Sequence, residues 1–135
     1  MEHNTQIKVY YADTDAYGVV WHGHYLRWLE RARCDFADAV GTPMKAVEEK
    51  NVVMPVVDIS LKYKNSALLH DELIIETSFY ELTKLKVSFL QKITEKNTRK
   101  PILEAVITCV TTDKSGKLYR RMPDEIYNLF KAAKE

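Results

Sequence analysis

Hydrophobic and polar residues alternate with a period of two in several stretches of the chain, which is the pattern of strands that bury one face. The first predicted strand runs from Gln6 to Ala12, where Ile7, Val9 and Tyr11 share one side. The other strands are predicted over 57–64, 72–82, 84–95 and 102–112. Hairpin-like turns at 97–101 and 113–117 are short, so neighbouring strands are expected to be antiparallel.

A different period marks the segment from Gly23 to Val40, where apolar residues such as Trp28, Leu29 and Phe36 recur every three or four positions. This pattern predicts a helix with one apolar face, which would be about 27 Å long at 1.5 Å per residue. Gly41 provides its natural end. Shorter helices are predicted over 42–50 and 124–134.

These elements define an α+β chain in which an antiparallel sheet wraps around one long helix. A length of 135 residues suits one domain, which we expect to span residues 1–135. Cys34 and Cys109 lie on or near apolar stripes and are predicted to be small core residues.

Composition narrows the functional classes. The chain is 46% hydrophobic and 29% charged, and no apolar run approaches the roughly 20 residues that would span a bilayer. The first residues lack the basic and apolar regions of a secretory signal, so a cytoplasmic location is expected. A net charge of +1 gives no general attraction for nucleic acid or membrane surfaces.

The segment from Tyr10 to Tyr25 concentrates ionisable groups just ahead of the long helix. It contains two aspartates and two histidines close to a helix N-terminus, where free N–H groups favour negative charge. This loop is therefore the candidate active site. Its acids also suit an ordinary turn, and a metal site is a minor alternative, because a spacing of two splays His22 and His24 apart.

The loop and the helix contain the pattern Tyr11-x-Asp13-Thr14-Asp15-x-x-Gly18-Val19-Val20-x-His22-x-x-Tyr25-Leu26, followed by Glu30-Arg31-Ala32-Arg33. This pattern resembles the hotdog-fold thioesterases, in the 4-hydroxybenzoyl-CoA thioesterase-like branch that includes the Tol-Pal-associated acyl-CoA thioesterases. The resemblance extends from about Ile7 to Pro123. It implies the hotdog fold and hydrolysis of an acyl-CoA thioester, with no cofactor besides the coenzyme A of the substrate.

Matched position by position, the resemblance makes Asp15 the catalytic carboxylate and His22 the histidine typical of the Tol-Pal-associated members. Asp13 is expected to order the loop by accepting backbone N–H groups. His24 is not part of the pattern, and Tyr17 stands where many relatives have a small residue.

Thioester hydrolysis requires a site for the oxyanion and a carboxylate that attacks the carbonyl or activates water. Asp15 suits either role, as general base or as nucleophile, and His22 can orient the water or the carbonyl. The backbone N–H groups of Trp21, His22 and Gly23 are predicted to bind the oxyanion. Support for the loop is expected from Asp13, Gly18 and Tyr25.

The resemblance also implies a homodimer or homotetramer with active sites built from two subunits, and an unpaired edge strand gives a physical reason for association. Basic residues are candidates for binding the phosphates of coenzyme A, namely Lys62, Lys64, Lys86, Arg120 and Arg121.

Two other functions remain open at this stage. One is a non-catalytic module that binds acyl-CoA or acyl-carrier protein, and the other is a hydratase or dehydratase of hydroxyacyl thioesters. The latter needs a second acid as well placed as Asp15. The acyl group is not determined, although Tyr17, Trp21 and Tyr25 hint at an aromatic-lined pocket.

Overall fold

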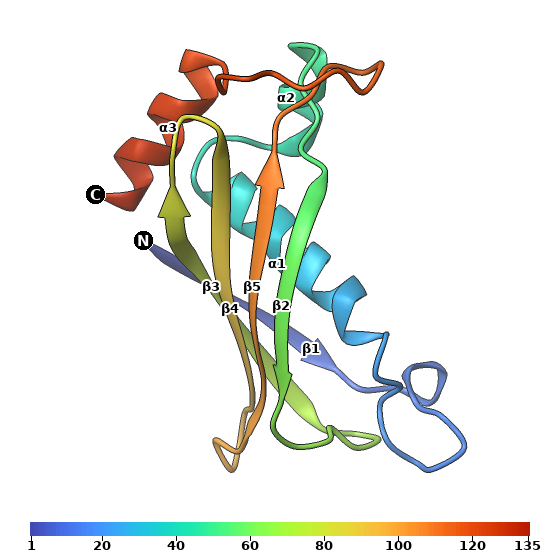
Figure 1. Cartoon of the computed structure of the whole chain (residues 1–135). Coiled ribbons are helices and arrows are strands. Elements are labelled where there is room, and N and C mark those ends of the chain that lie inside the picture. Colours follow the sequence, from blue (N-terminus) through green and yellow to red (C-terminus); the bar gives the residue numbers. More distant parts are fainter.

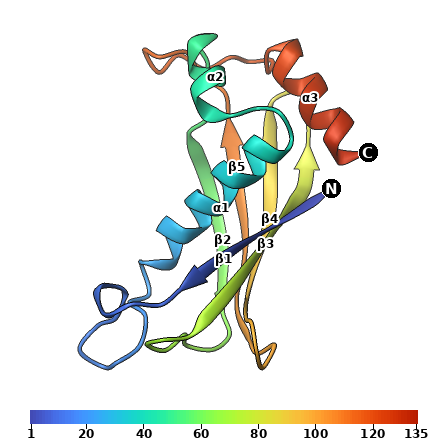
Figure 2. The ribbon, with the colours of Figure 1, turned by 180° about the vertical axis from the view of Figure 1, so that it is seen from behind.

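The computed structural model describes residues 1–135 and contains one antiparallel sheet of five strands in the order β1-β3-β4-β5-β2. The strands are β1 (Glu2–Lys8), β2 (Val56–Tyr63), β3 (Glu72–Leu82), β4 (Lys86–Glu95) and β5 (Pro101–Val110). Helix α1 (Tyr25–Ala39) crosses one face of this sheet (Figures 1 and 2). The α+β hotdog architecture predicted from the sequence is therefore confirmed.

Two short helices lie at one end of the sheet, α2 (Met44–Glu49) and α3 (Asp124–Lys134). Figure 2 shows both at the end where β2 begins, whereas the loop that precedes α1 lies at the opposite end. The helix predicted to start at Gly23 begins at Tyr25, after a turn over residues 22–24.

The first strand is where the sequence prediction was wrong. It spans Glu2–Lys8 and not 6–12, and Tyr11–Asp13 form a 3-10 turn in which the Tyr11 side chain is 73% exposed. The predicted alternation is correct in phase, since Ile7 and Val9 are buried. The strand pairing ends with Lys8 opposite Glu72, and beyond it only Val9 still bonds to the partner segment, through the backbones of Asp71 and His70.

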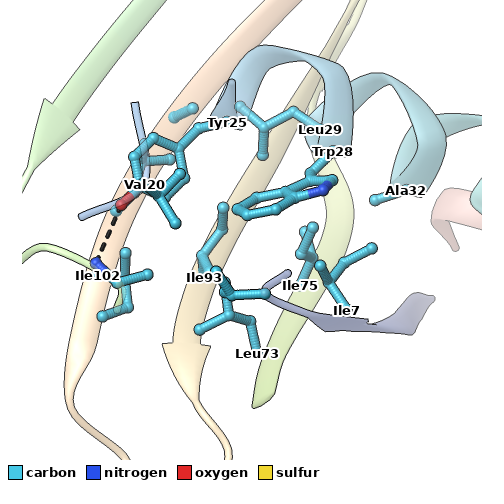
Figure 3. Close-up of a cluster of buried hydrophobic side chains, with 14 of the residues drawn as sticks. Ile7, Val20, Tyr25, Trp28, Leu29, Ala32, Leu73, Ile75, Ile93 and Ile102 are labelled. Carbon is cyan, nitrogen blue, oxygen red and sulfur yellow. Dashed lines mark hydrogen bonds between the residues drawn. The ribbon is translucent and has the colours of Figure 1, made fainter. Parts of the chain in front are cut away.

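The N-terminal half of α1 is fixed by apolar packing (Figure 3). Trp28 and Leu29 are buried against the sheet in a cluster that includes Ile75 and Ile93. Burying a large apolar side chain contributes about 1.5–3 kcal/mol, so this contact holds the helix start in place relative to the sheet. The position of the loop before Tyr25 follows from that anchoring.

A second cluster surrounds the C-terminal half of α1 and is rich in phenylalanine. Phe36 packs edge-on against Phe79 with ring centroids 5.0 Å apart, and Phe130 of α3 contacts Phe79 at 5.6 Å. Cys109 is buried in this cluster, as predicted, whereas Cys34 is only half-buried, and both thiols are free.

Strand β2 is an edge strand that pairs only with β5. Its side chains are poorly covered on both faces, and Val57 is 58% exposed. An apolar strand with unpaired backbone groups is a ready surface for association with another strand. No helix of the structure is both long and apolar enough to cross a membrane.

Candidate active site

The loop between β1 and α1 is closed on itself and attached to the segment before β3. Asp15 donates its N–H to the carbonyl of Val19 at 2.9 Å, and Val20 donates to Ala67 at 3.0 Å. Gly18 supports this turn with a φ of +78°, a conformation that side chains disfavour. These bonds give the loop a defined shape without regular secondary structure.

Asp15 lies beside a cleft of about 320 Å³ at the end of β2. One carboxylate oxygen, Oδ1, accepts the N–H of Tyr17 at 2.8 Å, and Oδ2 has no protein donor. The half-buried carboxylate is therefore oriented but keeps one oxygen available. The structure brings Asp15 together with other lining residues, among them Val20, His22, Tyr25, Tyr63 and Lys64.

The three backbone N–H groups predicted to bind an oxyanion differ in whether they are already hydrogen-bonded within the protein. Trp21 donates its N–H to the carbonyl of Asp13 at 3.1 Å, so this group is already occupied. The N–H groups of His22 and Gly23 have no acceptor in the protein. Only these two remain free to bind a ligand.

Tyr63 orients the peptide bond that carries one of the free amides, which sequence reasoning did not foresee. Its hydroxyl donates to the carbonyl of His22 at 2.6 Å. Because the C=O and N–H of a trans peptide point in opposite directions, this bond also sets the direction of the Gly23 N–H. No local pattern in the sequence signals this contact, because Tyr63 lies 41 positions from His22.

Gly23 lies in close contact with the Trp21 indole. A Cβ at this position would lie 2.5 Å from ring atoms of the Trp21 indole. The tryptophan ring therefore covers the glycine. The same ring lies beside the imidazole of His22, with the ring centroids 5.0 Å apart.

Asp13 connects the loop to the start of α1. Its Oδ1 lies 2.7 Å from Nε2 of His24, and its Oδ2 accepts the N–H of Tyr10 at 2.8 Å. The His24 ring packs edge-on against Trp28 at 4.8 Å. The histidine that falls outside the family pattern thus has a structural partner in the first aspartate of the motif.

Tyr25 forms the floor of the cleft and is buried. Its hydroxyl accepts the N–H of Ala67 at 3.0 Å, and its ring lies 5.8 Å from that of Tyr63. Burial raises the pKa of Tyr25 above its ordinary value.

The other aromatic residues of the loop do not line the cleft beside Asp15. Tyr17 is 90% exposed, and neither Tyr17 nor Trp21 lines the cleft, which takes its aromatic character from Tyr25 and Tyr63. Of the three residues that hint at an aromatic-lined pocket, only Tyr25 lines this cleft.

The basic residues proposed for phosphate binding fall into separate groups. Lys64 follows the end of β2 and lies at the cleft, with Nζ 3.2 Å from Oε2 of Glu104, and Lys62 is exposed on β2. Arg120 and Arg121 follow β5, at the end of the sheet remote from the loop (Figure 1). Lys86 begins β4 and lies at that remote end as well.

Comparison with known proteins identifies the protein family to which this chain belongs. The family model of the thioesterase-like superfamily matches residues 9–130, and the chain belongs to this superfamily. A curated relative, the acyl-CoA thioester hydrolase YbgC of Escherichia coli O6:H1, is 32% identical over 126 residues, which cover 93% of this chain and 92% of the relative.

Two solved structures share the fold. A hypothetical protein, TT1821 of Thermus thermophilus, is 31% identical with a TM-score of 0.89, over 98% of this chain and 97% of that one. The DHNA-CoA thioesterase of Staphylococcus aureus is 22% identical with a TM-score of 0.90, over 98% and 90% of the two chains.

Proposed function

We propose that this thioester hydrolase acts on acyl-CoA esters and that the reaction takes place in the cleft beside Asp15. The observation that carries this proposal is that Asp15, which has one available carboxylate oxygen, and His22, whose backbone N–H is unpaired, line the same cleft. The carboxylate activates the nucleophile, and the amides stabilise the charge that develops on the carbonyl oxygen. The similarity to an acyl-CoA thioester hydrolase supports the same substrate class.

The oxyanion is bound by the N–H groups of His22 and Gly23, without Trp21. Such a donor contributes about 3–4 kcal/mol to the transition state, because it is fixed before charge appears. Tyr63 and Trp21 hold this part of the backbone, through the His22 carbonyl and through packing over Gly23. The His22 imidazole assists by orienting the attacking water or the thioester carbonyl.

Asp15 acts either as general base toward water or as a nucleophile that forms a mixed anhydride. Both routes end in free acid and coenzyme A. In a single turnover in ¹⁸O-labelled water, label in the Asp15 carboxylate identifies the nucleophilic route, in which water attacks the aspartyl carbonyl of the anhydride and releases unlabelled acid. The general-base route places the label in the released acid.

The active unit is a homodimer formed through β2. Pairing two copies of this edge strand antiparallel around its middle brings the Val56 end of one copy beside the Tyr63 end of the other. Because the strands run in opposite directions, the end of the second copy that carries Arg120 and Arg121 then approaches the cleft of the first. The phosphates of coenzyme A are bound there together with Lys62 and Lys64.

Release of free thiol from a panel of acyl-CoA esters tests the proposal. We expect hydrolysis of at least one ester and a loss of about 10²–10⁴-fold in Asp15→Asn. Saturable binding of acyl-CoA without turnover would instead identify a binding module. Formation of enoyl product from a 3-hydroxyacyl-CoA would identify a hydratase or dehydratase.

A further inference from the structure

The hydroxyl of Tyr25 is a polar group of the Asp15 cleft that has no part in the reaction proposed above. Tyr25 is the first residue of α1 and lines the cleft together with Asp15 and His22. Only 2% of the residue is exposed. Buried polar groups are nearly always hydrogen-bonded, so each bond that this hydroxyl can form should have a partner.

The oxygen of the hydroxyl has a partner, but its hydrogen does not. Tyr25 Oη accepts the backbone N–H of Ala67 at 3.0 Å. A tyrosine hydroxyl can donate one hydrogen bond besides those it accepts, and no oxygen of the protein accepts from this one. A buried donor without an acceptor costs about 1–3 kcal/mol. The O–H of Tyr25 is therefore available to a molecule in the cleft.

Aromatic neighbours hold the Tyr25 ring in place. Its centroid lies 5.7 Å from that of Trp28 and 5.8 Å from that of Tyr63. Figure 3 shows Tyr25 within the buried cluster at the start of α1, and the hydrogen bond of its hydroxyl is drawn as a dashed line. A donor that is fixed before the ligand binds needs little reorganisation during a reaction, which makes it effective toward a developing charge.

The direction of the side chain associates this donor with the helix N-terminus. Side chains of a helix lean toward its N-terminal end, so Tyr25 leans toward the turn over residues 22–24. The backbone N–H of His22, in this turn, has no acceptor in the protein. Two residues of one cleft, three positions apart, thus each have an unpaired donor.

The carbonyl oxygen of a thioester is the acceptor that suits these donors. This oxygen has lone pairs for more than one hydrogen bond and becomes negative when the carbonyl is attacked. A hydrogen bond donated to the attacking oxygen would instead withdraw electron density from the nucleophile. Burial raises the pKa of Tyr25, which disfavours transfer of its proton and suits a hydrogen bond.

We propose that the Tyr25 hydroxyl donates a further hydrogen bond to the carbonyl oxygen of the bound thioester, beside the N–H of His22, while the N–H of Ala67 holds the hydroxyl in place. This inference rests on the proposed hydrolysis in the Asp15 cleft and adds a catalytic side chain to it. The O–H bond stays intact throughout. Negative charge develops on the carbonyl oxygen whether Asp15 acts as base or as nucleophile, so Tyr25 serves either route.

Kinetics of Tyr25→Phe provide the first test, because this change removes the donor and keeps the ring. We expect kcat/KM for the esters that the native protein hydrolyses to fall about 10²–10³-fold, mostly through kcat, since the bond strengthens as charge develops. The change also leaves the Ala67 N–H without its acceptor, so stability falls as well.

Tyr119→Phe is the matched control for that loss of stability. Its hydroxyl donates to the carbonyl of Asn51 at 2.9 Å, and neither residue lines the cleft. Tyr119→Phe should lower the melting temperature and leave kcat unchanged. A kcat of Tyr25→Phe equal to that of Tyr119→Phe would contradict the inference.

Infrared difference spectra test the hydrogen bond itself. Octanoyl-CoA and benzoyl-CoA, each with ¹³C at the thioester carbonyl, are compared for binding to Asp15→Asn, and the tighter ligand is used. Because a hydrogen bond lowers the stretching frequency of a carbonyl, we expect the band to lie at higher frequency in Asp15→Asn/Tyr25→Phe than in Asp15→Asn. A band at the same frequency in both variants overturns the inference.

The two measurements separate this inference from the proposed function. Turnover by the native protein with a carbonyl band that does not respond to Tyr25 overturns the inference and retains hydrolysis. A band that responds to Tyr25, without turnover of any ester by the native protein, overturns hydrolysis in this cleft and retains the contact.

If Tyr25→Phe loses its cooperative thermal transition, Tyr25→3-fluorotyrosine replaces it. The fluorinated hydroxyl still accepts the N–H of Ala67 and is a stronger donor than that of tyrosine. We then expect the carbonyl band in the Asp15→Asn background to move to lower frequency. An unchanged band would contradict donation by Tyr25.

Discussion

His24 and Asp13 are in contact across the candidate active-site loop, with Nε2 of the histidine 2.7 Å from Oδ1 of the aspartate. The two side chains are mostly shielded from water, and their backbones are joined through Trp21, which donates to the Asp13 carbonyl and accepts from the N–H of His24. The turn that carries the free amides of His22 and Gly23 is enclosed by these bonds.

A double-mutant cycle tests this coupling. Asp13→Ala and His24→Ala should each lower the free energy of unfolding and reduce kcat more than they change KM, because the amides act chiefly on the transition state. The expected coupling energy is about 0.5–3 kcal/mol, measured by denaturant unfolding of the two single variants and the double variant. His24→Gln should recover part of the loss, since its amide can donate. Strictly additive effects on stability and kcat would show that the pair does not position the loop.

Tyr63 should affect catalysis more than stability. Tyr63→Phe removes the hydrogen bond to the His22 carbonyl, while the ring keeps its contact with Tyr25. We expect kcat/KM to fall roughly three- to tenfold, the value of one ordinary hydrogen bond, with little change in melting temperature. Tyr80→Phe is the matched control, because the exposed Tyr80 hydroxyl has no protein partner. Equal activities of the Tyr63→Phe and Tyr80→Phe variants would show that the Tyr63 hydroxyl has no role in catalysis.

Association through β2 should be sensitive to charge on that strand. Ile59→Lys places an ammonium group in the middle of the exposed edge strand, and we expect the homodimer to dissociate and activity to fall with it. Sedimentation and thiol release measure the two effects. Leu129→Lys introduces the same charge at an exposed apolar position of α3 and should leave assembly intact. An unchanged dimer in Ile59→Lys would place the interface elsewhere.

Stability in acid should depend on Glu95, whose carboxylate caps the turn after β4. The backbone N–H of Thr98 is the main cause that lowers the pKa of Glu95, with further bonds from the Thr98 hydroxyl and from Asn97. Since the folded-state pKa lies below the ordinary value of 4.5, this contribution is present above that pH and is lost as the pH falls through the folded-state pKa.

Glu95→Gln should therefore be less stable than the native protein at neutral pH, and the difference should shrink as the pH drops below about 4.5. Thermal melting across this range measures it. Glu81→Gln alters an exposed carboxylate without a hydrogen bond and should show no such convergence. If the difference in stability between Glu95→Gln and the native protein stays constant with pH, the charge of Glu95 does not contribute to stability.

Local patterns predicted most of the architecture because each element buries one face against a shared core. The period of two in 72–82 and the period of 3.6 around Trp28 and Phe36 both reflect burial that the structure confirms. The predicted extent of β1 was wrong because the end of this strand depends on its partner β3, which is distant in the sequence. Its ladder ends where β3 begins, and no residue between Gln6 and Ala12 encodes that position.

The sequence by itself determined the elements, the family and the loop that concentrates the reactive groups, because periodicity and a dense local motif are properties of neighbouring residues. Only the tertiary structure decided which groups in that loop are free. The Trp21 amide is occupied by Asp13, Tyr63 reaches the His22 carbonyl from another strand, and the Tyr25 hydroxyl accepts the N–H of Ala67. Hydrogen bonds between distant residues depend on how the helix lies on the sheet, and that arrangement exists only after folding.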